Sequence, residues 1–125
     1  AGGLLAVHAD GNWNDLMRVH RRLNLIIYLN KDWKDEWGGH FELWSKTDNN
    51  TPNQCVKKIS PIFNRTVIFK TDDFSFHGHP HPLNCPEDES RKSLILYYYT
   101  ADRPKEELAS DDKHRALFHH PDDIL

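Results

Sequence analysis

Two side chains that commonly bind metals stand two positions apart near the start of the sequence. His8 and Asp10 end a short apolar run that favours a strand. Side chains at this spacing leave the same face of a strand, so the imidazole and the carboxylate can approach one ion. A His-x-Asp pair also arises often by chance, and it indicates a metal site only if a third ligand joins it.

Histidines that could complete the set are crowded into residues 76–81. His77, His79 and His81 lie where a predicted strand runs into a proline-rich loop. Two imidazoles and one carboxylate leave three adjacent positions open on an octahedral iron(II) ion. The keto-acid end of 2-oxoglutarate could chelate at two of them and dioxygen could take the third, which is the arrangement of a C–H oxidation catalyst. The alternatives are polar loop residues without a ligand, or a zinc site without catalysis.

A catalyst of this kind also needs a fixed cation for the far carboxylate of 2-oxoglutarate. Arg91 begins the last predicted strand, and Ser93 follows on the same face. Tyr28 is a third donor, because it shares a strand face with Arg22 and Asn24 whereas the opposite face is aliphatic. A polar face on so apolar a strand is typical of a ligand-lined barrel interior. Taken alone, an arginine at a strand edge is more often a surface residue, so the prediction depends on the whole constellation.

Short strands must position these groups. Alternation of side-chain type is clearest over residues 22–29. Segments rich in β-branched and aromatic residues predict further strands at residues 4–9, 41–44, 56–59, 66–70, 74–78 and 93–100. Clusters of Gly, Pro, Asn and Asp separate them. This pattern predicts an antiparallel sandwich or barrel, of which a jelly roll is one form.

Residues 104–117 are the segment with helical signals. Pro104 suits a first helical turn, two glutamates follow near the positive end of the helix dipole, and residues 113–115 are basic near the other end. We therefore expect a mainly all-β fold with a C-terminal helix. Residues 118–125 carry no usable pattern.

Size and charge exclude several classes of function. A chain of 125 residues has the usual size of one domain, so residues 1–125 are expected to form a single catalytic core. The net charge of -3, with basic and acidic residues intermixed, leaves no basic patch for nucleic acid. The longest apolar stretch, residues 23–29, is far shorter than the roughly 20 residues of a membrane span. Two distant cysteines and no signal-like segment favour a soluble, cytoplasmic protein.

The order of these motifs resembles the 2-oxoglutarate and iron(II)-dependent dioxygenases, in their prolyl-hydroxylase-like branch. Three stretches resemble the segment that follows the first two ligands in oxygen-sensing prolyl hydroxylases. They are IIYLNKDW at 26–33, the glycine pair at 38–39 and FELW at 41–44. The stretch NRTVIFKTD resembles the strand and turn before the distal ligand, which the family places five positions after the aspartate. Counting from Asp72 gives His77. The resemblance covers roughly residues 3–103.

The resemblance implies a double-stranded β-helix, which is a cupin-like jelly roll. Its catalytic iron ligands would be two histidines and an aspartate, namely His8, Asp10 and His77. Arg91 and Tyr28, with Ser93 beside them, would bind the far carboxylate of 2-oxoglutarate. The implied cofactors are iron(II), 2-oxoglutarate and dioxygen, with ascorbate as a candidate stimulant. The intact Asp10 implies hydroxylation, because halogenating members of the family lack that carboxylate.

A prolyl residue of a peptide or protein is the substrate that the resemblance favours. Asn12, Trp13 and His79 flank the implied metal and are the expected substrate contacts. An amino acid, a sugar or another small molecule is the rival substrate, and a non-catalytic metal-binding β-sandwich module is the rival function. Two departures from the family are expected: residues 80–90 form a longer loop than usual before the arginine, and the catalytic core is expected to lack the N-terminal helices and strand that support the barrel in the family.

Overall fold

The computed structural model describes residues 1–111 and 113–119, and most of its regular structure is β-strand. The strands are β1 (Leu5–Ala9), β2 (Trp13–Asn14), β3 (Val19–Tyr28), β4 (Phe41–Lys46), β5 (Pro52–Ile59), β6 (Thr66–Lys70), β7 (Phe76–His79), β8 (Ser93–Thr100) and β9 (Leu117–His119), and the 3-10 helices are η1 (Asp35–Trp37) and η2 (Lys105–Glu107). Within these described ranges, no helix has the length and apolar character needed to cross a membrane.

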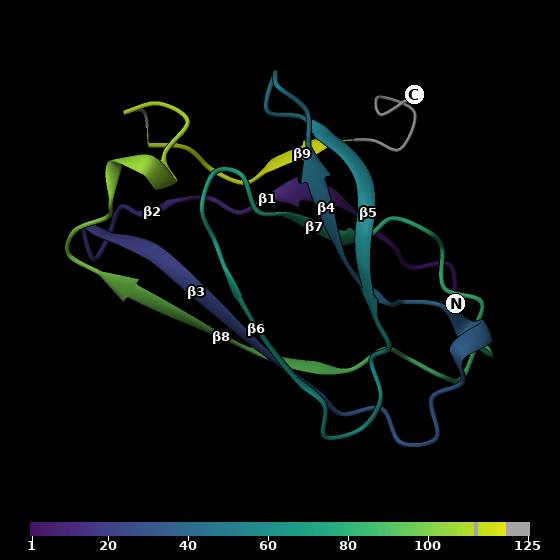
Figure 1. The fold of residues 1–125 in the computed structure, drawn as a ribbon. Coiled ribbons are helices and arrows are strands. Elements are labelled where there is room, and N and C mark those ends of the chain that lie inside the picture. Colours follow the sequence, from purple (N-terminus) through teal and green to yellow (C-terminus); the bar gives the residue numbers. More distant parts are fainter. Residues whose placement is uncertain (112, 120–125) are drawn as a thin grey trace.

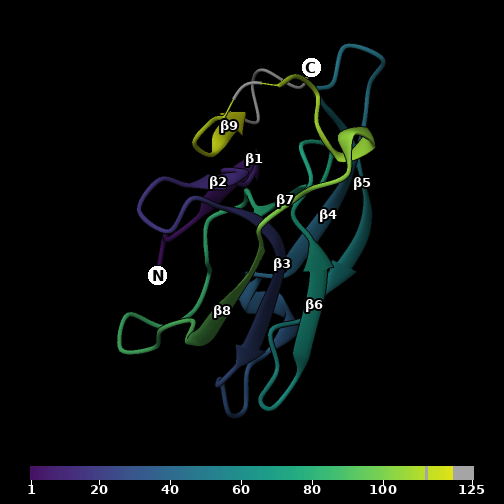
Figure 2. The ribbon, with the colours of Figure 1, turned by 90° about the vertical axis from the view of Figure 1, so that its left-hand side faces the viewer.

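Two antiparallel sheets face each other (Figure 1). One sheet has the strand order β5-β4-β7-β1-β9, and in the other β3 pairs with β2, β6 and β8. Strands that are distant in the sequence are therefore neighbours, as Figure 2 shows for β3 between β6 and β8. The prediction of a mainly all-β, jelly-roll-like fold is confirmed.

The alternation along β3 turns its polar face inward. Asn24 is 4% exposed and Tyr28 is fully buried, whereas Leu23 on the opposite face is 38% exposed. Pairing with β6 on one side and β8 on the other holds the strand in this register. The polar face thus looks into the space between the sheets, as a ligand-lined interior requires.

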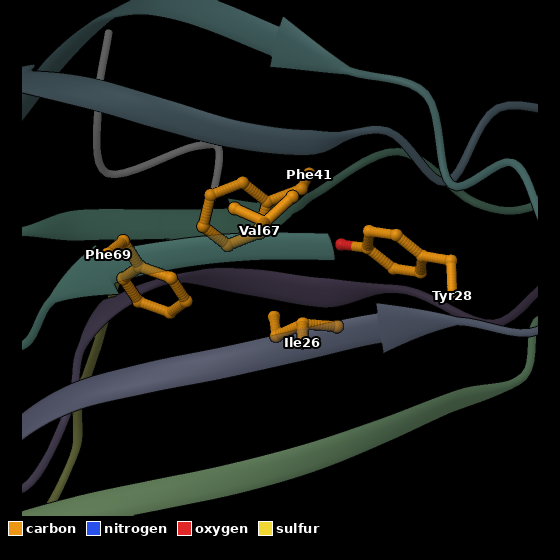
Figure 3. Packing of buried hydrophobic residues seen from close by; sticks show 5 residues of the cluster. All are labelled: Ile26, Tyr28, Phe41, Val67 and Phe69. Carbon is orange, nitrogen blue, oxygen red and sulfur yellow. The ribbon is translucent and has the colours of Figure 1, made fainter. Parts of the chain in front are cut away.

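The apolar core between the sheets is small. Its members come from β3, β4 and β6 and are shown in Figure 3: Ile26, Tyr28, Phe41, Val67 and Phe69. The Tyr28 hydroxyl points toward the rest of the cluster (Figure 3), and the Phe41 and Phe69 rings lie 4.8 Å apart. A second cluster, formed by Val7, Ala9 and Phe76, includes the residues of β1 that alternate with His8. Apolar packing on that face of β1 leaves the other face for polar side chains.

The predicted C-terminal helix over residues 104–117 is wrong. In the described part of this segment, helical structure is confined to the short turn η2, and the chain then runs to β9. Long-range contacts hold it in this path: Glu107 pairs with Arg22 at 3.1 Å, and the backbone N–H of Ala109 donates to the Asp73 carboxylate at 2.8 Å. The first contact draws the Glu107 side chain to β3, and the second takes up a backbone N–H that a helix would pair locally. Capping and dipole signals are worth a few tenths of a kcal/mol to about 1 kcal/mol each, which tertiary contacts readily outweigh.

Candidate metal centre

Backbone pairing brings the three predicted metal ligands together. β1 and β7 are antiparallel neighbours, and His8 lies directly opposite His77 in the ladder. Opposite residues of an antiparallel pair project to the same face, and Asp10 lies two residues beyond His8. The ligand atoms of all three side chains lie within 4.8 Å of one another, and all three residues are buried.

Each imidazole is oriented by a carbonyl of its own segment. His8 Nδ1 lies 2.9 Å from the carbonyl oxygen of Ala6, and His77 Nδ1 lies 2.9 Å from that of Ser75. When Nδ1 donates, Nε2 carries the lone pair that a metal needs. His8 Nε2 is 3.4 Å from Asp10 Oδ1 and His77 Nε2 is 3.7 Å from Oδ2, so the three donors converge on one point.

The Asp10 carboxyl is held in its charged form. Burial by itself would raise its pKa, but the neighbouring His8, His77 and Arg21 side chains outweigh burial and lower the pKa below its ordinary value. Asn24 Nδ2 donates to Oδ2 at 2.5 Å and fixes the orientation of the group. Asp10 is therefore a buried anion with a fixed orientation, which suits a cation between it and the histidines.

His77 is a neutral ligand at ordinary pH. Burial, followed by the charge of His8, lowers its pKa to about 4. The low-polarity environment has a visible cause, because the ring of Phe69 lies 4.6 Å and that of Phe41 5.6 Å from the His77 ring. A neutral imidazole is the form that binds metals, so no proton has to be displaced from this ring.

A turn held by an aspartate leads into His77. Asp72 Oδ1 accepts hydrogen bonds from the Phe74 backbone N–H at 3.0 Å and the Ser75 hydroxyl at 2.6 Å. This turn explains why β7 begins at Phe76, two residues later than the predicted strand.

Gly78 follows His77 in β7 and allows β7 to lie close to β1, the strand that carries His8. A Cβ atom at this position would lie 2.8 Å from the carbonyl oxygen of Leu5 and 2.9 Å from that of Ala6, and both are backbone atoms that cannot move alone. We expect Gly78→Ala to destabilise the protein by about 1–3 kcal/mol, as overpacking does, and to weaken metal binding because His8 and His77 move apart. Urea unfolding and metal titration measure the two effects.

Gly3→Ala is the matched control, because a Cβ atom there meets a side-chain methyl group at 3.7 Å. If Gly78→Ala unfolds at the same urea concentration as Gly3→Ala, the close approach of the strands does not constrain this position.

Arg91 lines the same cavity as the three predicted metal ligands. Its Nε donates to the carbonyl oxygen of Gly39 at 2.8 Å, and its Nη2 lies 3.4 Å from the Tyr28 hydroxyl. A cavity of about 140 Å³ is lined by the three predicted ligands together with Arg91, Ser93 and His79, among others. The structure thus brings the predicted metal ligands and the predicted Arg91 anchor to one cavity.

The three predicted substrate contacts lie in different surroundings. His79 lines the cavity, and burial, followed by the charge of Arg91, lowers its pKa to about 4. Asn12 is 2% exposed, and its side chain bonds to Asp73 and to the His114 backbone N–H. Trp13 lies outside the cavity lining, and the Lys113 amino group sits 3.5 Å from its ring centroid. Asn12 and Trp13 therefore do not line the cavity.

Arg21 is a site residue that the sequence reasoning missed. The period-two pattern places Arg22 on the inward face, but the register between β3 and β8 shifts between Arg21 and Leu23. The inserted residue re-aims the side chains. Arg21 Nη1 lies 3.8 Å from Asp10 Oδ1, and the guanidinium stands 4.2 Å above the Tyr97 ring. No signal in the sequence marks this bulge.

Comparison with known proteins agrees with the geometry. Residues 1–99 match the family described as the 2OG-Fe(II) oxygenase superfamily. Prolyl 3-hydroxylase OGFOD1 of Mus musculus is 33% identical over 79 residues, which make up 63% of this chain and 14% of that protein, so the chain spans a small part of this relative's length. Because the family match covers well over half of the chain, the chain belongs to the 2OG-Fe(II) oxygenase superfamily, whose members use iron(II), 2-oxoglutarate and dioxygen.

Proposed function

We propose that His8, Asp10 and His77 hold iron(II) through two Nε2 atoms and one carboxylate. The observation that carries the proposal is the convergence of three buried ligand atoms within 4.8 Å, with both imidazoles oriented from behind by a backbone carbonyl. A structural zinc site takes four protein ligands. The described residues place three such groups here, which favours a site with open positions.

We propose that Arg91 and Tyr28 bind the far carboxylate of 2-oxoglutarate, with Ser93 lining the same cavity. When bound, iron(II), 2-oxoglutarate and dioxygen would together supply the oxidising chemistry that hydroxylates a C–H bond and converts 2-oxoglutarate to succinate and carbon dioxide. Arg91 supplies a charged, forked donor whose position is set by its bond to Gly39. Burial raises the pKa of Tyr28 against the opposing charge of Arg91, so the hydroxyl stays protonated at neutral pH and can donate.

Gly39 makes room for Arg91, which gives a test of this anchor. Its φ is +71°, and a Cβ atom there would lie 2.9 Å from Arg91 Cδ and 2.7 Å from a methyl group of Leu83. Because the arginine must move, we expect Gly39→Ala to weaken 2-oxoglutarate binding by about tenfold or more, the loss of roughly one charge-assisted hydrogen bond. Anaerobic titration of 2-oxoglutarate into the iron(II)-loaded protein measures the affinity.

Gly38→Ala separates backbone strain from steric displacement. Gly38 has φ +73°, but a Cβ atom there meets nothing within 4 Å. The Gly38→Ala variant should therefore have the same backbone strain as Gly39→Ala but keep the wild-type affinity for 2-oxoglutarate. Equal losses of affinity in the two variants would mean that the loop, rather than the position of Arg91, controls binding.

We propose that the substrate is a prolyl residue of a peptide or protein. The likeness to a prolyl 3-hydroxylase supports this class.

Mass spectrometry tests the substrate. The protein is incubated with iron(II), 2-oxoglutarate, ascorbate and air, together with capped proline-containing peptides and, separately, free amino acids and sugars. We expect an oxygen atom to be added to a prolyl residue, with one succinate formed for each product. Oxygen added to a free metabolite but to no peptide would replace the prolyl substrate by a small molecule. Absence of succinate with every candidate would contradict catalysis by this chain.

A further inference from the structure

The last described strand places an aromatic ring against a proposed iron ligand. β9 runs beside β1 (Figure 1), and Phe118 lies directly opposite His8 in the ladder. The two rings stack with their centroids 4.7 Å apart and an angle of 27° between their planes. His8 is buried, but Phe118 is 57% exposed, so much of the phenyl ring is uncovered beside the metal site.

The neighbours of Phe118 on β9 face the other way. Leu117 pairs with Ala9 and His119 with Val7, and these partners belong to the apolar cluster on the opposite face of β1. The His119 ring accordingly contacts Phe76, with the centroids 5.4 Å apart. Phe118 is therefore the residue of β9 that shares the face of the proposed iron ligands.

Side-chain contacts fix the segment that carries β9. The buried Asp73 carboxylate receives the Ala109 backbone N–H at 2.8 Å, His114 Nε2 at 2.9 Å and Asn12 Nδ2 at 3.2 Å. Asn12 Oδ1 in turn accepts the His114 backbone N–H at 3.2 Å. These contacts fasten the segment to the loop that follows Asp10, so β9 has a fixed position beside β1.

The same loop is shaped to let the segment pass. A Cβ atom at Gly11 would lie 3.1 Å from the carbonyl oxygen of His114, which is closer than most real contacts of this kind. The glycine directly after Asp10 thus lets the C-terminal backbone pass close to the proposed metal centre.

We propose that Phe118 is a specificity-determining residue: its exposed ring is an apolar wall beside His8, against which the ring of a prolyl substrate lies. This inference rests on the proposed function, because it assigns a contact to the proposed substrate. An exposed phenyl ring gains most from covering an apolar group, and the methylene groups of the pyrrolidine ring offer such a surface. A sugar or a charged amino acid would bring polar groups to the same surface and gain less.

The experiment compares Phe118→Ser, Phe118→Tyr and Leu117→Ser. Leu117 is the matched control, because it lies on the same strand, is 49% exposed and faces away from the proposed ligands. Calorimetry measures binding of a capped proline-containing peptide to the protein loaded with iron(II) and 2-oxoglutarate under nitrogen, and assays in air give KM and kcat.

For Phe118→Ser we expect the peptide Kd and KM to rise by about tenfold or more, while kcat and the affinity for 2-oxoglutarate stay unchanged. Phe118→Tyr and Leu117→Ser should remain within about twofold of the wild-type peptide affinity, a difference that is small on this scale.

A second variant tests the wall without touching Phe118. His114→Ala removes one donor to Asp73 and should raise the peptide KM in the same direction, with 2-oxoglutarate affinity unchanged. If Phe118→Ser binds the peptide as tightly as wild type, or if it loses 2-oxoglutarate affinity as well, the ring has no specificity role. If the wild-type protein binds no prolyl peptide, the proposed substrate and the role of Phe118 are both wrong. If the wild-type protein binds the peptide and Phe118→Ser binds it equally tightly, only the role of Phe118 is wrong.

Discussion

Replacement of His77 by alanine is expected to abolish the visible charge-transfer band that iron(II) and 2-oxoglutarate form with the protein in the absence of oxygen. His77 supplies one of three converging ligand atoms, and removing it leaves only His8 and Asp10 to hold the ion. Loss of contacts that merely orient a ligand costs 10–100-fold in metal affinity, so loss of the ligand should cost more than about a hundredfold. Anaerobic titration followed by absorbance measures the band and the metal affinity together.

His79→Ala is the matched control for this prediction. His79 stands two residues further along the same strand, lines the same cavity and is also a neutral imidazole at ordinary pH. It should keep the band, because its ring is not among the converging ligand atoms. A band that survives in His77→Ala but disappears in His79→Ala would move the third ligand and overturn the proposed centre. Circular dichroism of each variant shows whether it is folded.

The positions of the metal-binding side chains follow from short-range rules, which is why the sequence predicts them. His8 and Asp10 share a face because strand side chains alternate, and His77 joins them because β7 pairs with β1. The choice of His77 over its two neighbours needed the family resemblance, since the pairing register is not written in the alternation itself. The inward polar face of β3 is another success of the period-two pattern, as the buried Asn24 and Tyr28 show.

The structure of the C-terminal segment could not be predicted from local sequence patterns. Its local signals favour a helix, but the side chains of Glu107 and His114 bind residues that are distant in the sequence: Glu107 pairs with Arg22, and His114 pairs with Asp73. The strand at residues 117–119 has no alternation of its own and exists because it pairs with β1. The bulge that turns Arg21 toward Asp10 is likewise a property of two paired strands. Local patterns thus predict the centre of the site, whereas tertiary pairing determines its rim.

Arg91→Ala is expected to remove most of the affinity for 2-oxoglutarate. Breaking a buried charge pair by deleting one partner costs about 3–5 kcal/mol, which corresponds to roughly two to four orders of magnitude in Kd. The guanidinium is held from two sides, by the Gly39 carbonyl oxygen and the Tyr28 hydroxyl, so no other described cation has the same position. Titration of 2-oxoglutarate into the iron(II)-loaded protein under nitrogen measures the loss. Lys92→Ala should leave this affinity unchanged, because the side chain is exposed.

The two largest effects should separate the two halves of the site. Arg91→Ala keeps all three proposed ligands, so in the absence of 2-oxoglutarate it should bind iron(II) with the affinity of the wild type. His77→Ala should lose affinity for both iron(II) and 2-oxoglutarate. Arg91→Lys refines the test: it keeps the charge, but a lysine cannot make the forked contact, so an intermediate affinity is expected. If Arg91→Ala binds 2-oxoglutarate as tightly as wild type while the band still depends on His77, the metal centre stands and the carboxylate anchor must be sought elsewhere on the cavity wall.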